Sequence, residues 1–451
     1  MTNNFSDILL NCCKNKSLKV KFSELDLSGD SGLFLVKQAE EKIKICQGMA
    51  NCLEDSRQEG KVTHSKIRLI LQRVFQIVAG YEDVNDSNYL RHDPMLKILC
   101  NQAEKKERDV QVLASQPTMS RWENQITNQE NKELRKYFVK QFLAQYPKDA
   151  TQIVLDIDGW DAQTYGNQQL SLFHGYYGHK MYFPLLINEA STGYPLIMQL
   201  RAGNSHSGKG IVGLLRWLFW YIKKVRPKLK IIIRGDGGFS LPEIIRICER
   251  SEVEYAFGFS SNAVLKRKID NLLEIARVVH CLTGKKARLF DDVYYAAKSW
   301  NEPRRIIMKA EWLEKGPNPR FVATNLEGEP AQVYDGFYVQ RGESSEGRIK
   351  ELKRGIKADR LSCHQFIVNQ FRLYLSQAAY ILMLEIRQAA KGTKLEKAQV
   401  SRLRESIIKV VGKVTISIRQ ILIEISSCCP YQKEISIIAK HLLSPKSMIF
   451  V

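Results

Sequence analysis

The pattern of apolar and polar positions divides the chain into a helical first part and a region of alternating strands and helices. Residues 1–150 are mainly helical in pattern, and 66–79 carries its apolar side chains along one helical stripe. After residue 150, apolar runs of strand length alternate with longer helical patterns. We predict strands at 151–158, 174–188, 195–202, 230–236 and 254–259, and helices at 208–226 and 241–251. This β-β-β-α-β-α-β order predicts an antiparallel meander followed by crossover units, hence an α/β mixed sheet with helices on its faces.

The pattern changes at residues 262–330, where short strand patterns lie between turns rich in Gly, Pro and charged residues. We interpret this stretch as a β-rich insertion between two parts of the sheet domain, 151–261 and 331–392. The remaining C-terminal region, 393–451, is expected to be helical. The strands expected in the insertion are 288–298, 304–311 and 320–325, and the helices expected after it include 366–392, 400–427 and 433–443.

The charge of the chain indicates a polyanionic partner. Lys and Arg number 68 against 48 Asp and Glu, a net charge of +20 over 451 residues. Each cation that neutralises a phosphate releases condensed counterions, so such an excess favours nucleic acid. Short capped helices with exposed polar residues, such as the one expected around Arg121, suit phosphate and groove contacts. We therefore expect the helical region 1–150 to bind DNA, and an ordinary helical bundle is the other explanation of its pattern.

Other features favour a cytoplasmic, nucleoid-associated protein. The ten cysteines form no Cys-x-x-Cys pair and are interpreted as reduced thiols. The N-terminus lacks the basic-then-apolar pattern of a signal peptide. The most apolar stretch, 210–222, is short and interrupted by Arg216, so we expect no membrane partner.

Two of the predicted strands end in an aspartate, Asp158 and Asp236. Two glycines follow Asp236 and leave its carboxylate uncovered. Because strand side chains alternate between faces, Asp156 shares a face with Asp158 and is the alternative to it. Asp158 is preferred because it stands at the strand end beside Gly159. A carboxylate there is costly without water or a cation, and such sheets bind ligands at the carboxyl ends of their strands.

A third acidic residue, Glu346, begins a helical and basic stretch. Lys350 and Lys353 share a helix face with it. A solvated charged face is the ordinary explanation of such a run, whereas beside a metal-binding glutamate it would hold the DNA backbone. Three carboxylates that converge from distant parts of the sequence would form a site for two divalent cations in a phosphoryl-transfer enzyme. The six basic residues of the stretch are Arg348, Lys350, Lys353, Arg354, Lys357 and Arg360.

Several motifs between about residues 60 and 385 together carry a resemblance to a known family. They lie at 73–83, 90–94, 113–121, 173–177, 236–239, 318–322, 341–342 and 349–351. On these motifs the chain resembles insertion-sequence DDE transposases with a ribonuclease-H-like core, in particular the insertion-sequence family numbered thirteen-eighty. The resemblance implies an acid triad, which we place on Asp158, Asp236 and Glu346, holding two Mg²⁺ or Mn²⁺ ions. It also implies cleavage and strand transfer of double-stranded DNA, with the element's terminal inverted repeats and the target DNA as partners and a homodimer pairing the two ends.

The family signature Tyr-x-x-Arg-x-x-x-Glu-x-x-x-x-x-x-Lys fits this chain with one residue in excess. Glu346 and Lys353 have the right spacing, but Tyr338 and Arg341 lie one residue too far upstream. Strict spacing from those two lands on Ser345. Glu343 is the alternative to Glu346 as the third acid.

The resemblance also suggests which residues contact DNA. Tyr338, Arg341, Lys350 and Lys353 are expected to position phosphates near the ions, in addition to Arg121 in the N-terminal region. An aromatic of the insertion would stack on an unpaired end base, as DNA enzymes that expose bases use. Trp300 is the candidate and Trp312 the second, and a place in the hairpin core is the other explanation for both.

Two other functions share parts of this pattern. A transposase-derived DNA-binding protein with decayed catalysis fits the imperfect signature. A less specific metal-dependent nuclease fits the carboxylates, but it would not need the helical region 1–150.

Overall fold

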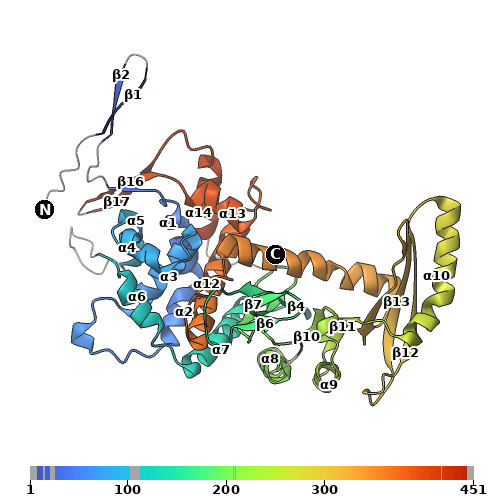
Figure 1. Ribbon diagram of the computed structural model, residues 1–451. Helices are drawn as coiled ribbons and strands as arrows, with labels where there is room; N and C mark the ends of the chain where they lie inside the picture. The colour runs from blue at the N-terminus through green and yellow to red at the C-terminus, as the bar shows by residue number, and fades with distance from the viewer. Residues whose placement is uncertain are drawn as a thin grey trace.

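In the computed structural model, the described residues are 8–13, 16–20, 26–101, 112–206, 208, 210–417 and 419–443. At the centre lie five strands in the order β9-β8-β4-β10-β11. Figure 1 labels β4, β10 and β11 of this sheet. Strand β4 runs parallel to β10, and β10 runs parallel to β11, whereas β8 and β9 form an antiparallel meander. This is the strand order of a ribonuclease-H-like core, and it confirms the predicted β-β-β-α-β-α-β sequence. The bounds are β4 Gln152–Gly159, β8 Leu185–Glu189, β9 Pro195–Gln199, α8 Val212–Val225, β10 Lys230–Gly235, α9 Pro242–Arg250 and β11 Glu254–Phe259.

The predicted strand 174–188 is divided in the structure. Its first part contributes to a separate three-stranded sheet of order β5-β7-β6, and its last residues form β8 of the main sheet. The interruption falls at Pro184, whose missing N–H cannot donate to a ladder. The small sheet consists of β5 Ala162–Gln163, β6 Leu172–His174 and β7 His179–Tyr182.

The insertion forms an arm at one end of the main sheet (Figure 1). It begins with a 21-residue helix, α10 Ala263–Thr283, which the sequence analysis did not anticipate. The Asn262 side chain caps this helix by accepting from the N–H groups of Val264 and Leu265. The expected strands follow as β12 Ala287–Tyr295, β13 Arg304–Leu313 and β15 Arg320–Thr324, with β14 Gly316–Pro317 beside β13. Because β15 pairs antiparallel with β11, the arm continues the central sheet.

A helical segment, residues 332–356, returns from the arm over the sheet (Figure 1), and we call it the site helix. Three of its stretches are π-helical: Gln332–Tyr338, Gly342–Glu346 and Glu351–Ile356. One α-helical turn, α11 Gly347–Lys350, lies between the last two. Isolated π turns each accommodate one extra residue and occur frequently at functional sites.

The N-terminal region is largely helical, as predicted, although it also contains short strands. Its helices are α1 Leu33–Ile43, α2 Ile45–Asn51, α3 Lys66–Ala79, α4 Ser87–Leu90, α5 Pro94–Cys100, α6 Gln116–Glu123 and α7 Asn128–Gln145. Its strands are β1 Ile8–Cys13, β2 Lys16–Val20 and β3 Leu27–Ser28.

The predicted helix at 400–427 is wrong after residue 408. Helix α13 Val400–Leu403 and a π turn end there, and an antiparallel hairpin follows, β16 Gly412–Ile416 and β17 Ile421–Ile425. Strand β16 also pairs with β3 from the other end of the chain. That partner is distant in sequence, so local periodicity carried no sign of it. Helix α14, Gln432–Leu443, agrees with the prediction.

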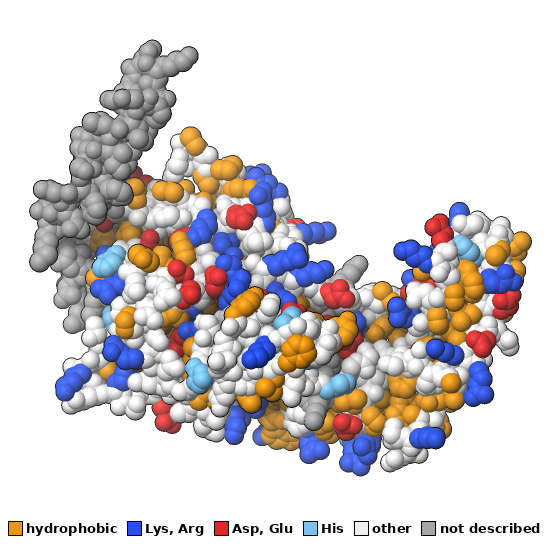
Figure 2. All heavy atoms as spheres, in the orientation of Figure 1, with side chains coloured by type: hydrophobic (Ala, Val, Ile, Leu, Met, Phe, Trp, Pro, Cys, Tyr) orange, Lys and Arg blue, Asp and Glu red, His pale blue; other side chains and the backbone are white. Residues whose placement is uncertain are grey.

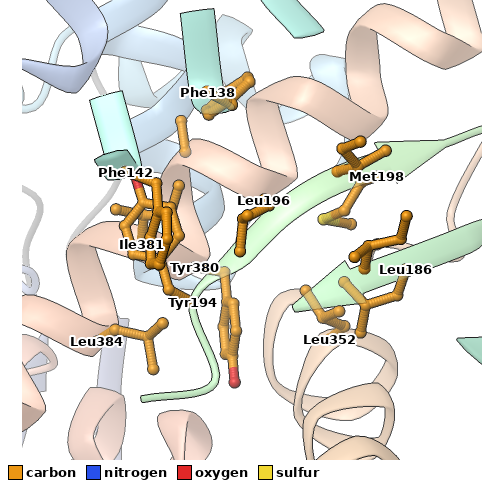
Figure 3. Close-up of a cluster of buried hydrophobic side chains, with 14 of the residues drawn as sticks. Phe138, Phe142, Leu186, Tyr194, Leu196, Met198, Leu352, Tyr380, Ile381 and Leu384 are labelled. Atoms are coloured by element: carbon orange, nitrogen blue, oxygen red, sulfur yellow. The ribbon is translucent and has the colours of Figure 1, made fainter. Parts of the chain in front are cut away.

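The hydrophobic core joins the N-terminal helices to the sheet through α12, Phe366–Ala389. Figure 3 shows Tyr380 and Ile381 of α12 among side chains from α7, β8 and β9, with Leu352 of the site helix close by. The site helix is therefore anchored in the main core. Within the described ranges, no helix has the length and apolar character needed to cross a membrane.

Candidate active site

Asp158 and Asp236 lie side by side at the carboxyl ends of two parallel strands. The register of β4 and β10 pairs Ile157 with Gly235, so the next residue of each strand is an aspartate. The Asp158 side chain is 14 % exposed. Burial, followed by the charge of Asp236, raises the pKa of Asp158 to about 6. Two carboxylates this close are mutually repulsive when ionised, which is the electrostatic setting that a cation relieves.

Asp156, the alternative to Asp158, has a different partner. It is fully buried and accepts two hydrogen bonds from Arg234 on β10, Oδ1 from Nε at 2.7 Å and Oδ2 from Nη2 at 2.9 Å. Arg234 also donates to the carbonyl of Phe337 at 2.6 Å. This bidentate pair ties the sheet to the site helix, and Asp158 is the one that faces the cleft.

The loop after β10 keeps Asp236 accessible. Its Oδ1 accepts from the N–H of Gly238 at 2.9 Å. A Cβ on Gly237 would lie 3.6 Å from the Gly258 carbonyl, an ordinary contact. A Cβ on Gly258 would instead lie 2.6 Å from the Tyr338 hydroxyl, so this glycine admits the tyrosine ring to the site.

Two residues of the site helix contact Asp158. The Ser345 hydroxyl donates to Asp158 Oδ2 at 3.1 Å, and an Arg341 Nη1 lies 3.4 Å from the same oxygen. Arg341 also lies over the Tyr338 ring, with 5.7 Å between guanidinium and ring centroid. Ser345, which is fully buried, makes the shorter of these two contacts with Asp158.

The one-residue excess in the signature coincides with the π turn Gly342–Glu346. In a π turn the hydrogen bond joins residues i and i+5, so residues five apart occupy the positions that i and i+4 occupy in an α-helix. Arg341 and Glu346 are five apart. The extra residue is thus absorbed within one turn, with Ser345 directed at Asp158 and the exposed Glu346 beside it. The side chain of Glu343 lies outside the described part of the structure.

Glu346 lines a cleft of about 670 Å³ together with Asp158. The cleft wall formed by the site helix is cationic, and the opposite wall comes from β4 and from the segments that follow it. Lys353 of the helix wall donates to Asp161 at 2.8 Å. Figure 2 shows Lys and Arg side chains gathered in the hollow between the main body and the arm. The residues around the cleft are Asp158, Gly159, Trp160, Asp161, Tyr177, Glu346, Ile349, Lys350, Lys353, Arg354, Lys357, Asp359 and Arg360.

The donor set of the site suits Mg²⁺ or Mn²⁺, because these ions prefer carboxylate oxygens. Asp158 and Asp236 fit one side of such a site. As the side chains stand, no three His, Cys, Asp or Glu among the described residues are grouped closely enough to hold a metal ion. Glu346 lines the same cleft as Asp158 but does not complete a cluster with the two aspartates.

The other residues predicted to contact DNA lie in separate parts of the structure. Tyr338 lies near both aspartates, whose charges raise its pKa in addition to the larger effect of burial. Arg121 is exposed on α6, in the N-terminal region. Trp300, predicted to stack on DNA, is only 8 % exposed and packs on Phe259 and Tyr295 at 5.3 and 5.9 Å. The stacking assignment of Trp300 is therefore wrong, and the tryptophan belongs to the core at the base of the arm.

The sequence analysis did not single out Asp161, Tyr177 or the contact of Ser345 with Asp158. Tyr177 belongs to the motif 173–177, which was noted without a role. Strict spacing from Tyr338 and Arg341 did point to Ser345. Asp161 follows Asp158 by three residues and gave no periodic signal.

Nearly the whole chain matches the model of one protein family. Residues 10–446 match a family model described as transposase DDE domain, group 1. No match was found among curated proteins. Among solved structures, the cryo-EM structure of a piggyBac transposase synaptic complex with hairpin DNA is similar to 98 % of this chain and 85 % of that chain, with 12 % sequence identity and a TM-score of 0.42.

Proposed function

The chain belongs to the family of transposase DDE domains of group 1, and we propose that it cuts the terminal inverted repeats of its own element and joins them to target DNA. The observation that carries this proposal is the pair Asp158 and Asp236, adjacent at strand ends beside a cleft with a cationic wall. We further propose that the chain is related to the insertion-sequence family numbered thirteen-eighty.

Asp158, Asp236 and Glu346 would hold the divalent cations, Mg²⁺ or Mn²⁺. When bound, the two ions supply activation of the attacking oxygen and stabilisation of the leaving oxygen at the scissile phosphodiester. Arg341 and Ser345 fix the orientation of the Asp158 carboxylate through Oδ2. The other oxygen, Oδ1, accepts from the N–H of Gly159 at 2.8 Å.

The cationic wall would bind the DNA backbone. Lys350, Arg354 and Arg360 are exposed along it. Lys353 and Lys357 are held by carboxylates, Lys353 by Asp161 at 2.8 Å and Lys357 by Glu82 at 3.0 Å. The exposed cations would meet the phosphates first, so their replacement should weaken binding to all DNA sequences and reduce the salt dependence of binding.

The direct test uses duplexes that carry the inverted repeats flanking the encoding DNA. The unaltered protein with Mg²⁺ or Mn²⁺ should nick them at their tips. Asp158→Ala, Asp236→Ala and Glu346→Ala should each abolish cutting while retaining end binding. Retained cutting by Asp236→Ala would overturn the assignment.

The neighbouring serine provides a matched control for the third acid. Ser345→Ala should leave substantial cutting, because it removes an orienting hydrogen bond and no carboxylate. If the true ligand position were 345, the double variant Ser345→Glu with Glu346→Ala would be active. We expect that double variant to be inactive, because the π turn directs residue 345 into the buried contact with Asp158.

One observation favours a second candidate, a transposase-derived protein that binds ends without cutting. Among the described side chains of the site helix, Ser345 and Arg341 contact Asp158, and no carboxylate does. Specific end binding without metal-dependent nicking would support this candidate. For the active enzyme we also propose a homodimer that pairs two ends, which light scattering of the protein–DNA complex would measure.

A further inference from the structure

The hairpin formed by β6 and β7 presents aromatic side chains beside the cleft. The tip between β6 and β7 spans residues 175–178, and Gly178, with φ of +74°, donates its N–H to the His174 carbonyl at 2.8 Å. At this tip Tyr176 is 88 % exposed, and Phe173 on the adjoining strand is 61 % exposed. Large aromatic side chains left in water next to a cleft indicate a binding surface.

The tip reaches the reacting region through Tyr177. This residue lines the cleft with Asp158. Burial raises the pKa of its phenol, and the charges of Asp161, Asp158 and Asp236 raise it further, so the phenol lies within electrostatic reach of both aspartates. The Tyr176 ring meets the Tyr177 ring edge to face, with centroids 5.1 Å apart.

Tyr177 is supported from behind by other rings. His174 lies at 5.1 Å and Phe183 at 6.1 Å between ring centroids. The Arg201 guanidinium covers the Phe183 ring at 4.7 Å. Tyr177 is thus held in place, while the Tyr176 ring is exposed to solvent.

The charge of the cleft indicates what the exposed Tyr176 ring would bind. Lys350, Arg354 and Arg360 line the cleft to which Tyr177 also belongs. Aromatic rings combined with a cationic groove are the usual contacts of unpaired nucleotides, whose bases stack while their phosphates are neutralised. We propose that Tyr176, fixed by Tyr177, stacks on an unpaired base next to the scissile phosphate. This inference rests on the proposed function and gives the hairpin tip the stacking role that Trp300 does not fill.

The test compares cleavage of two duplexes that carry the flanking inverted repeats. One is fully paired, and the other has an abasic site at the nucleotide next to the scissile phosphate, with each side of that phosphate tried in turn. On paired DNA, Tyr176→Ala should cut about 5- to 150-fold more slowly, the range expected for loss of one base–aromatic stack. Tyr176→Phe should keep the rate. Tyr294→Ala, at a tyrosine that is 72 % exposed on β12, is the matched control and should cut normally.

The abasic duplex distinguishes stacking from a structural role. Where the stacked base is absent, Tyr176→Ala and the unaltered protein should cut at equal rates. An equal defect on both duplexes, or normal cutting of paired DNA by Tyr176→Ala, would overturn the stacking contact and leave the proposed function intact. Failure of the unaltered protein to cut any end would overturn both.

Discussion

Asp156 and Asp158 stand two residues apart on one face of β4, yet their replacement by asparagine should change stability in opposite directions. Asp156 is fully buried against Arg234, whose side chain is 3 % exposed. Removing one partner of such a pair leaves the other charge buried and costs roughly 3–5 kcal/mol. Because the asparagine oxygen still accepts one hydrogen bond, we expect Asp156→Asn to fall near the lower end, about 3 kcal/mol.

For Asp158 the ionised carboxylate is itself destabilising without a cation. Its pKa is about 6 in the folded chain against an ordinary value of 3.8. The folded state therefore binds the proton more tightly, and stability is lost as pH rises from about 4 to about 6. Above that window the difference corresponds to roughly 3 kcal/mol, an upper estimate. Asp158→Asn in EDTA at pH 8 should therefore stabilise the protein by up to about 3 kcal/mol, and by less at pH 5.

Both effects are measured by urea unfolding of the full chain in EDTA at pH 5 and pH 8. A further variant, Asp156→Leu with Arg234→Met, removes both charges together and should recover much of the stability that Asp156→Asn loses. Destabilisation by Asp158→Asn at pH 8, or a neutral Asp156→Asn, would refute the different roles assigned to the two aspartates.

Three further changes test other parts of the structure. Glu385 on α12 is buried, its oxygens accept no hydrogen bond from the described residues, Lys42 Nζ lies 3.6 Å away, and burial raises its pKa to about 7. Glu385→Gln should therefore increase the free energy of unfolding at pH 8 by roughly 3 kcal/mol at most, and by less at pH 5. The thermal midpoint should rise more at pH 8 than at pH 5, and an equal rise at both pH values would contradict this. Trp300→Ala should cost roughly 3–5 kcal/mol in urea unfolding, because it empties a core site, while the soluble folded fraction should still cut DNA ends normally. Gly237→Ala should keep cutting activity and increase the free energy of unfolding by roughly 0.4–1 kcal/mol, because its Cβ has room and its φ is not positive. Gly258→Ala should instead impair cutting, because its Cβ would displace Tyr338. Equal cutting by the two variants in a nicking assay would be inconsistent with the site geometry.

Much of the central sheet was predictable because its signals are local. Apolar runs such as 153–157 and 231–233 specify buried strands within a few residues, and the helices between them have their own periodicity. Once the strand order was known, Asp158 and Asp236 had to come together, since the carboxyl ends of parallel neighbours lie at one edge. The sequence thus placed each aspartate at a strand end, and the strand order of the fold paired them.

Other features depended on partners far away in the chain. The local pattern favoured Asp158 over Asp156 only by its place at the strand end. Arg234, 78 residues after Asp156, decides which carboxylate is neutralised. The hairpin β16–β17 replaced a predicted helix in a region that pairs with β3 at residues 27–28. The sequence pattern was compatible with an exposed Trp300, but in the fold Phe259 and Tyr295 pack against its ring.

The sequence by itself determined the sheet, the positive charge and the place of two aspartates, because periodicity and strand ends are properties of short segments. The tertiary structure decided which acids are paired, where the extra residue of the site helix is absorbed and which aromatic remains exposed. Those outcomes depend on burial and on neighbours brought in by the fold, and neither is written in any one segment.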